Sequence, residues 1–110
     1  MRKSTLDALK TLDAWRKAYK KMRWAKDVVY DFVDAYCDDT SPVSAEDAPE
    51  IKRLLGKFEA YEEKATAEWE KISDEVDELK KRFRRNKTVT ARLDEIGHYI
   101  AVSEGLIFPD

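Results

Sequence analysis

Residues 12–36 read LDAWRKAYKKMRWAKDVVYDFVDAY, and their apolar side chains recur at the spacing of an amphipathic helix. One row has intervals of seven residues: Trp15, Met22, Val29 and Tyr36. A second row is offset by three or four residues and has Lys26 as its one polar member. Rows of this kind form an apolar stripe that packs against another helix. Because no Gly or Pro interrupts the pattern, we expect a helix over about residues 5–37.

The segment after this helix is the one obvious loop. Residues 38–47 are rich in Ser, Thr and Asp and contain Pro42, which stops a helix. A second helix is expected over about residues 48–86, opened by a capping box of Asp47 and Glu50. It carries two further heptad rows. A third, shorter helix is expected over about residues 90–103, with Thr88 or Thr90 as its N-cap.

The two long helices are expected to lie antiparallel. Folding the chain about residue 43 or 44 pairs positions whose numbers add up to about 88, so that Tyr19 faces Trp69. In the same register Lys26 faces Glu62, the one polar member of its own row, which indicates a pair that sets the register. The predicted fold is all-α: a long antiparallel, coiled-coil-like hairpin plus a short third helix in a single domain, residues 1–110.

The third helix is too short to cover the hairpin. A helix of the first segment's length spans roughly 50 Å, and the third covers less than half of it. Large uncovered apolar surfaces usually mark interfaces, so we expect either a homodimer that forms a helical bundle or an obligate partner. Apolar residues outside the main rows are the candidates for self-association: Trp24, Val28, Leu54 and Tyr61.

Charge is sorted into blocks, although the formal net charge is only −2. Residues 1–26 sum to +7, residues 27–50 to −8 and residues 80–92 to +7. The hairpin therefore has an acidic and a basic pole, and such fields steer charged partners. The candidate acidic pole consists of Asp31, Asp34, Asp38, Asp39 and Glu46. The candidate basic pole consists of Arg16, Lys17, Lys20, Lys80, Lys81, Arg84 and Arg85.

Catalytic and metal-binding patterns are not found. The chain has one Cys and one His, Cys37 and His98, which are too few for a zinc site and are not placed together. The acidic turn does not have the spacing of an EF-hand. We therefore expect no enzyme activity, cofactor or metal. No apolar run approaches the roughly 18 residues of a membrane helix, and a lone Cys favours a cytoplasmic location.

Residues 93–107, LDEIGHYIAVSEGLI, resemble a helix-turn-helix with Ala101–Ser103 in the turn. That family continues into a recognition helix, which binds the major groove of DNA. In this chain Gly105 and Pro109 interrupt that second helix.

The leading functional prediction is a non-enzymatic protein–protein interaction module, such as an adaptor, an inhibitor or an assembly factor. Small, charge-dense chains without catalytic residues are common among the accessory proteins of phages and plasmids. The alternative is a nucleic-acid-binding protein that uses the basic blocks at residues 2–26 and 80–92, because clustered Lys and Arg neutralise phosphates.

Overall fold

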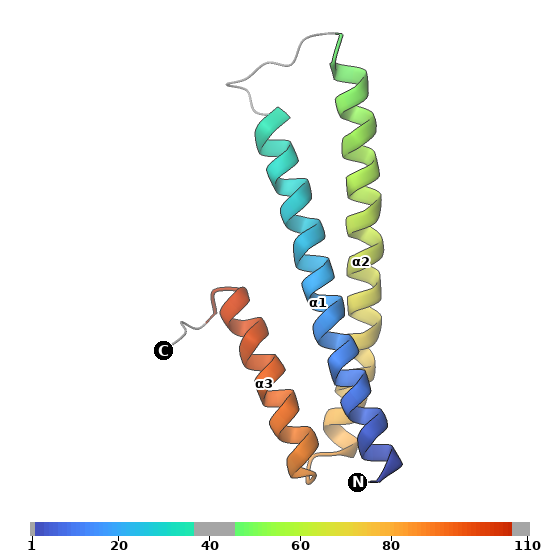
Figure 1. Ribbon diagram of the computed structural model, residues 1–110, viewed down its shortest axis with the longest axis vertical. Coiled ribbons are helices and arrows are strands. Elements are labelled where there is room, and N and C mark those ends of the chain that lie inside the picture. The colour runs from blue at the N-terminus through green and yellow to red at the C-terminus, as the bar shows by residue number, and fades with distance from the viewer. Residues whose placement is uncertain (1, 37–45, 107–110) are drawn as a thin grey trace.

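The computed structural model describes residues 2–36 and 46–106, and three helices contain nearly all of them (Figure 1). They are α1 (Lys3–Tyr36), α2 (Ala48–Arg82) and α3 (Lys87–Ser103). α1 and α2 lie antiparallel along the long axis, and α3 packs on α1 less extensively. The described residues include no strand. The prediction of an all-α hairpin with a shorter third helix is confirmed.

Contacts between α1 and α2 confirm the predicted register. The rings of Tyr19 and Trp69 lie 5.9 Å apart between centroids. The indole N–H of Trp15 donates to Ser73 Oγ at 2.9 Å. Each of these two pairs has residue numbers that add up to 88. The heptad rows, which determine how the two stripes meet, therefore fix the relative position of the helices.

Lys26 and Glu62 do not form the predicted ion pair. Both side chains line the same shallow groove, so they lie on facing helices, but no ion pair within 4.0 Å joins them. Glu62 instead accepts a hydrogen bond from Thr66 Oγ1 at 3.1 Å. Lys26 is exposed because no third helix covers this level. An ion pair between solvated side chains gains little free energy, so the two groups are not held together.

The lower half of the molecule in Figure 1, near the chain's N-terminus, contains the buried core. Leu12, Val76 and Ile96 come from three different helices and are each at most 1% exposed. A second cluster lies immediately above: Tyr19, Met22, Ala25 and Ala65. Fully burying a side chain of this size contributes about 1.5–3 kcal/mol relative to leaving it exposed. The apolar face of α3 therefore completes a core that α1 and α2 begin.

The turn between α2 and α3 differs from the predicted one. α2 ends at Arg82, four residues earlier than expected, and Asn86 has extended backbone angles. Asn86 Oδ1 accepts a hydrogen bond from the Val89 N–H at 3.1 Å and so caps α3. The predicted caps, Thr88 and Thr90, lie inside the helix. The physical reason is that Asn is a better N-cap than Thr, and this Asn also reaches α1, where its Nδ2 lies 3.3 Å from Thr5 Oγ1.

The predicted capping box at the start of α2 is not formed. Asp47 occupies the N-cap position with helical backbone angles (φ −88°, ψ −20°), and its side chain makes no capping hydrogen bond. Capping by a side chain normally requires a non-helical backbone at this position. Glu50 pairs instead with Arg53, Nη2 to Oε1, at 2.5 Å. These hydrogen bonds lower the pKa of the Glu50 carboxyl group.

The resemblance of residues 93–107 to a helix-turn-helix does not extend to the structure. Ala101–Ser103 is the last part of α3 and not a turn. The chain leaves the helix at Gly105, whose φ of +73° lies in the left-handed region that glycine adopts most readily. Cys37, the predicted last residue of the first helix, lies outside the described residues.

Candidate interaction site

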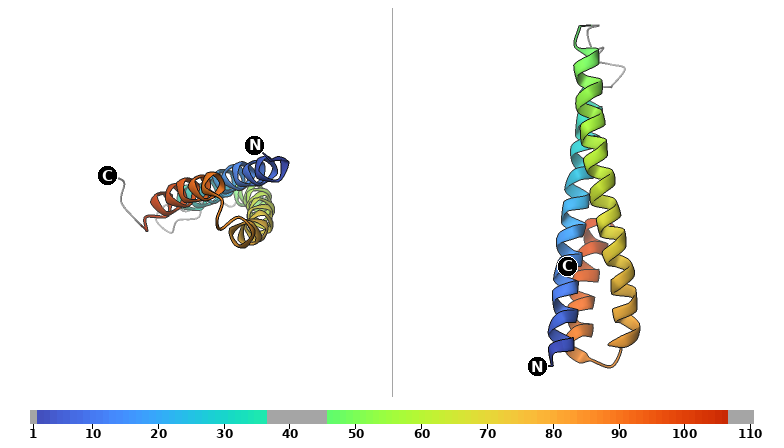
Figure 2. Two further views of the ribbon diagram at one scale, coloured as in Figure 1. Left: turned by 90° about the horizontal axis from the view of Figure 1, so that it is seen from below. Right: turned by 90° about the vertical axis from the view of Figure 1, so that its right-hand side faces the viewer.

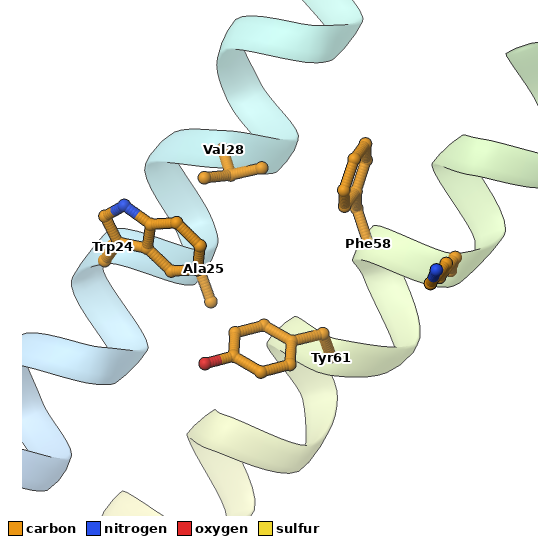
Figure 3. Close-up of a pocket in the computed structure, with 6 residues that line it drawn as sticks. Trp24, Ala25, Val28, Phe58 and Tyr61 are labelled. Carbon is orange, nitrogen blue, oxygen red and sulfur yellow. The ribbon is translucent and has the colours of Figure 1, made fainter.

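An apolar groove crosses the hairpin above the level of the core, with a volume of about 280 Å³. Figure 3 shows Trp24, Ala25 and Val28 of α1 facing Phe58 and Tyr61 of α2. Lys57 completes the lining, and no residue of α3 takes part. Nine residues, at 100° each, place Val28 on the opposite side of α1 from Tyr19, whose ring contacts Tyr99 of α3. We call this hollow the back-face groove.

The walls of the back-face groove are held in a defined geometry. The rings of Trp24 and Tyr61 meet edge to face, with centroids 5.9 Å apart and an interplanar angle of 89°. Such pairs contribute about 0.5–1.5 kcal/mol beyond the burial of their area. Lys21 Nζ lies 5.9 Å from the centre of the Tyr61 ring and 3.2 Å from Glu68. Tyr61 is thus positioned by two residues of α1.

Exposure is concentrated at the rim of the groove. Trp24 is 59% exposed and Tyr61 is 39% exposed, whereas Ala25, which forms the floor, is only 1% exposed. A large aromatic surface is therefore presented to solvent above a closed base. The lining is mainly apolar and aromatic, and Lys57 is its one charged member.

The structure brings together three of the four residues predicted for self-association: Trp24, Val28 and Tyr61. Leu54 is half-buried and lies seven residues before Tyr61, on the same line of α2 but outside the lining. The sequence analysis did not predict that Phe58 lines the groove, because its heptad position assigned it to the seam between the helices. The spacing could have indicated it: Phe58 and Tyr61 are three residues apart and are therefore neighbours on one face of the helix.

A second, shallower groove lies on the side of the hairpin that α3 covers further down. Its lining is mixed in polarity: Lys26, Val29, Tyr30, Val33, Glu59, Glu62 and Glu63. Lys26 and Val33 follow Tyr19 at intervals of seven and so continue its line on α1. α3 ends at Ser103, below this level, and leaves Tyr30 68% exposed. We call it the upper groove.

The end of α3 is fastened to α1 through Glu104. Tyr19 Oη donates to Glu104 Oε1 at 2.5 Å, and Arg23 Nη1 lies 3.7 Å from Glu104 Oε2. Burial raises the pKa of the Tyr19 hydroxyl well above its ordinary value, and the hydrogen bond to Glu104 raises it further. The hydroxyl therefore keeps its proton, and donates this hydrogen bond, across the pH range in which proteins usually function.

The residues of the predicted basic pole lie in separate places, and two of them contact Tyr99 of α3. Arg16 and Lys20 lie over its ring at 5.7 and 5.5 Å from the centroid, where cations interact with the π-face. These two cations thus lie against the side of α3. Arg84 and Arg85 follow the end of α2 at the lower tip and line a different hollow, together with Lys87. Sequence reasoning had no signal for the Tyr99 contacts.

The lower tip has cations without acidic partners. Arg84, Arg85 and Lys87 make no ion pair with any described carboxylate. Lys80 and Lys81, in contrast, lie 3.6 Å from Asp77 and 3.7 Å from Glu78. Lys17 is exposed on α1, as are Asp31 and Asp34 of the predicted acidic pole, and Glu46 is exposed just before α2. Asp38 and Asp39 lie outside the described residues.

Within residues 2–36 and 46–106, no group of three His, Cys, Asp or Glu side chains is arranged to hold a metal ion. His98 is exposed on α3, and Cys37 lies outside this part of the chain. In the same ranges, none of the three helices combines the length and the apolar character that a membrane crossing requires.

Known proteins provide no assignment for the back-face groove. Comparisons of the chain with protein-family models, with curated proteins and with solved structures give no match in any of the three. The role of the groove is therefore inferred from its own geometry and chemistry.

Proposed function

We propose that the chain is a non-enzymatic protein–protein interaction module and that the back-face groove is its docking site. The observation that supports this proposal is the pair of exposed rings, Trp24 and Tyr61, which stand with half-buried Val28 and Phe58 over a buried floor. Single exposed apolar side chains are ordinary, but contiguous apolar patches mark interaction sites. Trp and Tyr are also the residues that most often dominate the free energy of binding at interfaces.

The groove suits a partner that inserts an apolar side chain. The edge-to-face pair of Trp24 and Tyr61 is already formed, so binding orders few additional rotamers and costs little conformational entropy. Lys57 is exposed in the lining and provides a cation at the rim, whereas Lys21 beside it is already paired with Glu68. A partner with an apolar anchor and acidic flanks therefore complements the groove. An adaptor, an inhibitor or an assembly factor would use such a site.

Capture experiments with matched variants test this proposal. Immobilised wild-type chain, Trp24→Ala and Tyr30→Ala are incubated with host lysate, and the retained proteins are identified by mass spectrometry. Both variants remove an exposed aromatic residue from α1, but only Trp24 lines the back-face groove. We expect Trp24→Ala to lose partners that Tyr30→Ala retains. Identical partners for wild type and Trp24→Ala would contradict the proposal, provided that circular dichroism shows equal helix content.

A second candidate function is nucleic-acid binding at the lower tip. The specific observation in its favour is the set of cations that form no ion pair, Arg84, Arg85 and Lys87, around one hollow whose lining includes a single acid, Asp94. Lys and Arg that neutralise phosphates release counterions, so such binding falls steeply with added salt. The acidic residues of α2 and of the upper half of α1 oppose a close approach of DNA along the hairpin, and we therefore rank this function second.

Charge reversal at the lower tip separates the two functions. Replacing Arg84 and Arg85 with Glu abolishes binding if phosphates are held there, and leaves an interaction at the back-face groove unchanged. If a basic protein surface docks at the acidic pole instead, reversal of Asp31 and Asp34 lowers its association rate. We expect no measurable binding to duplex DNA at physiological salt. A sub-micromolar affinity under those conditions would reverse the ranking.

A further inference from the structure

One line of exposed residues runs along α1 through the edge of the back-face groove. Its members recur every seven residues and are all exposed: Lys3, Lys10, Lys17, Trp24 and Asp31. A spacing of seven keeps side chains on one line of a helix in a coiled-coil-like hairpin. The line is therefore basic below Trp24 and acidic above it, with the most exposed wall of the groove at the change of sign.

The neighbouring line of α1 permits a close approach by another helix. It consists, again at intervals of seven, of Ala14, Lys21, Val28 and Ala35. Ala14 and Ala35 are exposed, which gives small side chains on either side of the groove. Short side chains at these positions leave room for a second helix backbone about 15 Å below and above Trp24.

The whole of α1 shows the same division of charge as this line: its lower part is basic and its upper part is acidic. Residues 2–23 contain eight bases and two acids, whereas residues 26–36 contain one base and three acids. A second copy that runs antiparallel places its acidic half beside the basic half of the first. A parallel copy places like charges together, which is unfavourable.

We infer that the occupant of the back-face groove is a second copy of the chain, related by a two-fold axis that passes near Trp24. This inference rests on the proposed function and names the partner. Trp24 of each copy packs into the groove of the other, and Lys17 of each copy lies opposite the partner's Asp31. Such a contact is isologous, so each copy contributes the same surface and every pairing occurs twice.

The apolar and the charged parts of this contact have different roles. Burial of the Trp24 indole supplies most of the affinity, because buried aromatic anchors dominate interfaces. The pairs of Lys17 with the partner's Asp31 are exposed and contribute little affinity each. They select the antiparallel orientation, which brings opposite charges together at both ends of the contact.

Sedimentation of the full chain at micromolar concentration tests for the dimer. We expect about twice the chain mass of 12.8 kDa. Trp24→Ala should weaken the dimer at least about tenfold, whereas Tyr30→Ala, on the other side of α1, should leave it unchanged. A wild-type chain that stays monomeric at every concentration overturns the inference. If Trp24→Ala still loses captured partners in that case, the proposed function stands; if it loses none, both fail.

Charge exchange tests the arrangement and uses only exposed positions, so folding is preserved. Lys17→Asp and Asp31→Lys should each weaken the dimer several-fold, because every pair in the contact then has like charges. The double variant should recover wild-type affinity. Within one copy the two residues lie about 21 Å apart along the helix, too far for direct contact, so recovery arises between copies.

Mixing the two single variants gives a further readout. The variant Lys17→Asp has acids at both positions 17 and 31, and Asp31→Lys has bases at both, so the mixture should form a heterodimer more tightly than either variant alone. The control is Lys52→Asp, an exposed reversal on α2 away from the groove, which should leave affinity unchanged. Single reversals at residues 17 and 31 that leave the dimer unchanged would overturn the antiparallel arrangement.

Discussion

The lower and upper halves of the hairpin carry the same heptad pattern but differ in burial. The lower half has residues of three helices in its core, among them Leu12, Val76 and Ile96. In the upper half, at residues 26–36 and 46–64, none of the described side chains is buried. The difference teaches that an apolar stripe is not by itself a core. A third element must cover the stripe to exclude water from it.

The reach of α3 explains the difference. Figure 2 shows α3 beside the lower part of α1, with the hairpin continuing beyond it. Two helices side by side bury only the seam between them, whereas a third helix packed over the seam encloses the side chains along it. The back-face groove and the upper groove both lie in or next to the part that α3 does not cover. The proposed interaction surface is thus located where the core ends.

Truncating one leucine in each half should give the largest contrast. Leu12→Ala removes a side chain with no exposed surface and should lower the free energy of unfolding by about 3 kcal/mol, since a cavity remains. Leu55→Ala removes a half-buried side chain on α2 and should cost about 1 kcal/mol. Urea denaturation followed by circular dichroism measures both. Equal losses would show that the two halves are packed alike.

Hydrogen exchange should separate the halves without any mutation. Amides of residues 26–36 and 50–62 should exchange at least about tenfold faster than those of residues 8–22 and 66–78. Local opening requires less free energy where few apolar contacts hold a helix. Mass spectrometry of peptides from each half gives the rates. At high protein concentration the inferred dimer should slow exchange near Trp24, and uniform rates at low concentration would contradict the contrast.

The Tyr19–Glu104 contact, which fastens the end of α3, should give a smaller effect with a pH dependence. Tyr19→Phe should lower the free energy of unfolding by about 1 kcal/mol at neutral pH. The raised pKa of Tyr19 means that the folded state holds this proton more tightly than the unfolded state. Its stabilising contribution is complete below about pH 10 and is lost as the pH rises above that value.

Denaturation at several pH values tests whether stability falls, as expected, when the pH rises above about 10. The wild type should lose stability more steeply above about pH 10 than Tyr19→Phe does. Tyr30→Phe, at an exposed position, serves as the matched control and should keep the wild-type slope. Equal slopes for wild type and Tyr19→Phe would show that the phenol does not hold its proton in the way the contact requires.

The smallest expected effect on stability comes from replacing one glycine in each of two helices with alanine. Gly56 lies in the upper half of α2 and Gly97 lies in α3, and an added Cβ would meet nothing within 4 Å at either position. Each change to Ala should therefore stabilise its helix by up to about 1 kcal/mol. Gly97→Ala should raise the global free energy of unfolding. Gly56→Ala should mainly slow exchange in the upper half. If both substitutions raised the global free energy of unfolding equally, the two halves of the molecule would unfold as one cooperative unit.

Much of this architecture was predictable because it depends on local pattern. The heptad rows predicted the two long helices and their register, which the contact of Tyr19 with Trp69 confirms. The off-row positions predicted Trp24, Val28 and Tyr61 as uncovered residues. Sequence reasoning failed at the helix ends, where Asn86 replaces the predicted caps, and at Lys26 and Glu62, which do not pair. In each case the outcome depends on whether another helix lies nearby.

By itself the sequence determined the helices, their pairing and the division of charge along α1, because these follow from the spacing and type of residues along the chain. Only the tertiary structure decided where the stripe is buried, which side α3 covers and which aromatic residues remain exposed around one groove. The physical reason is that burial depends on the relative positions of all three helices. A periodic pattern specifies that a face is apolar, but the neighbouring elements determine what covers it.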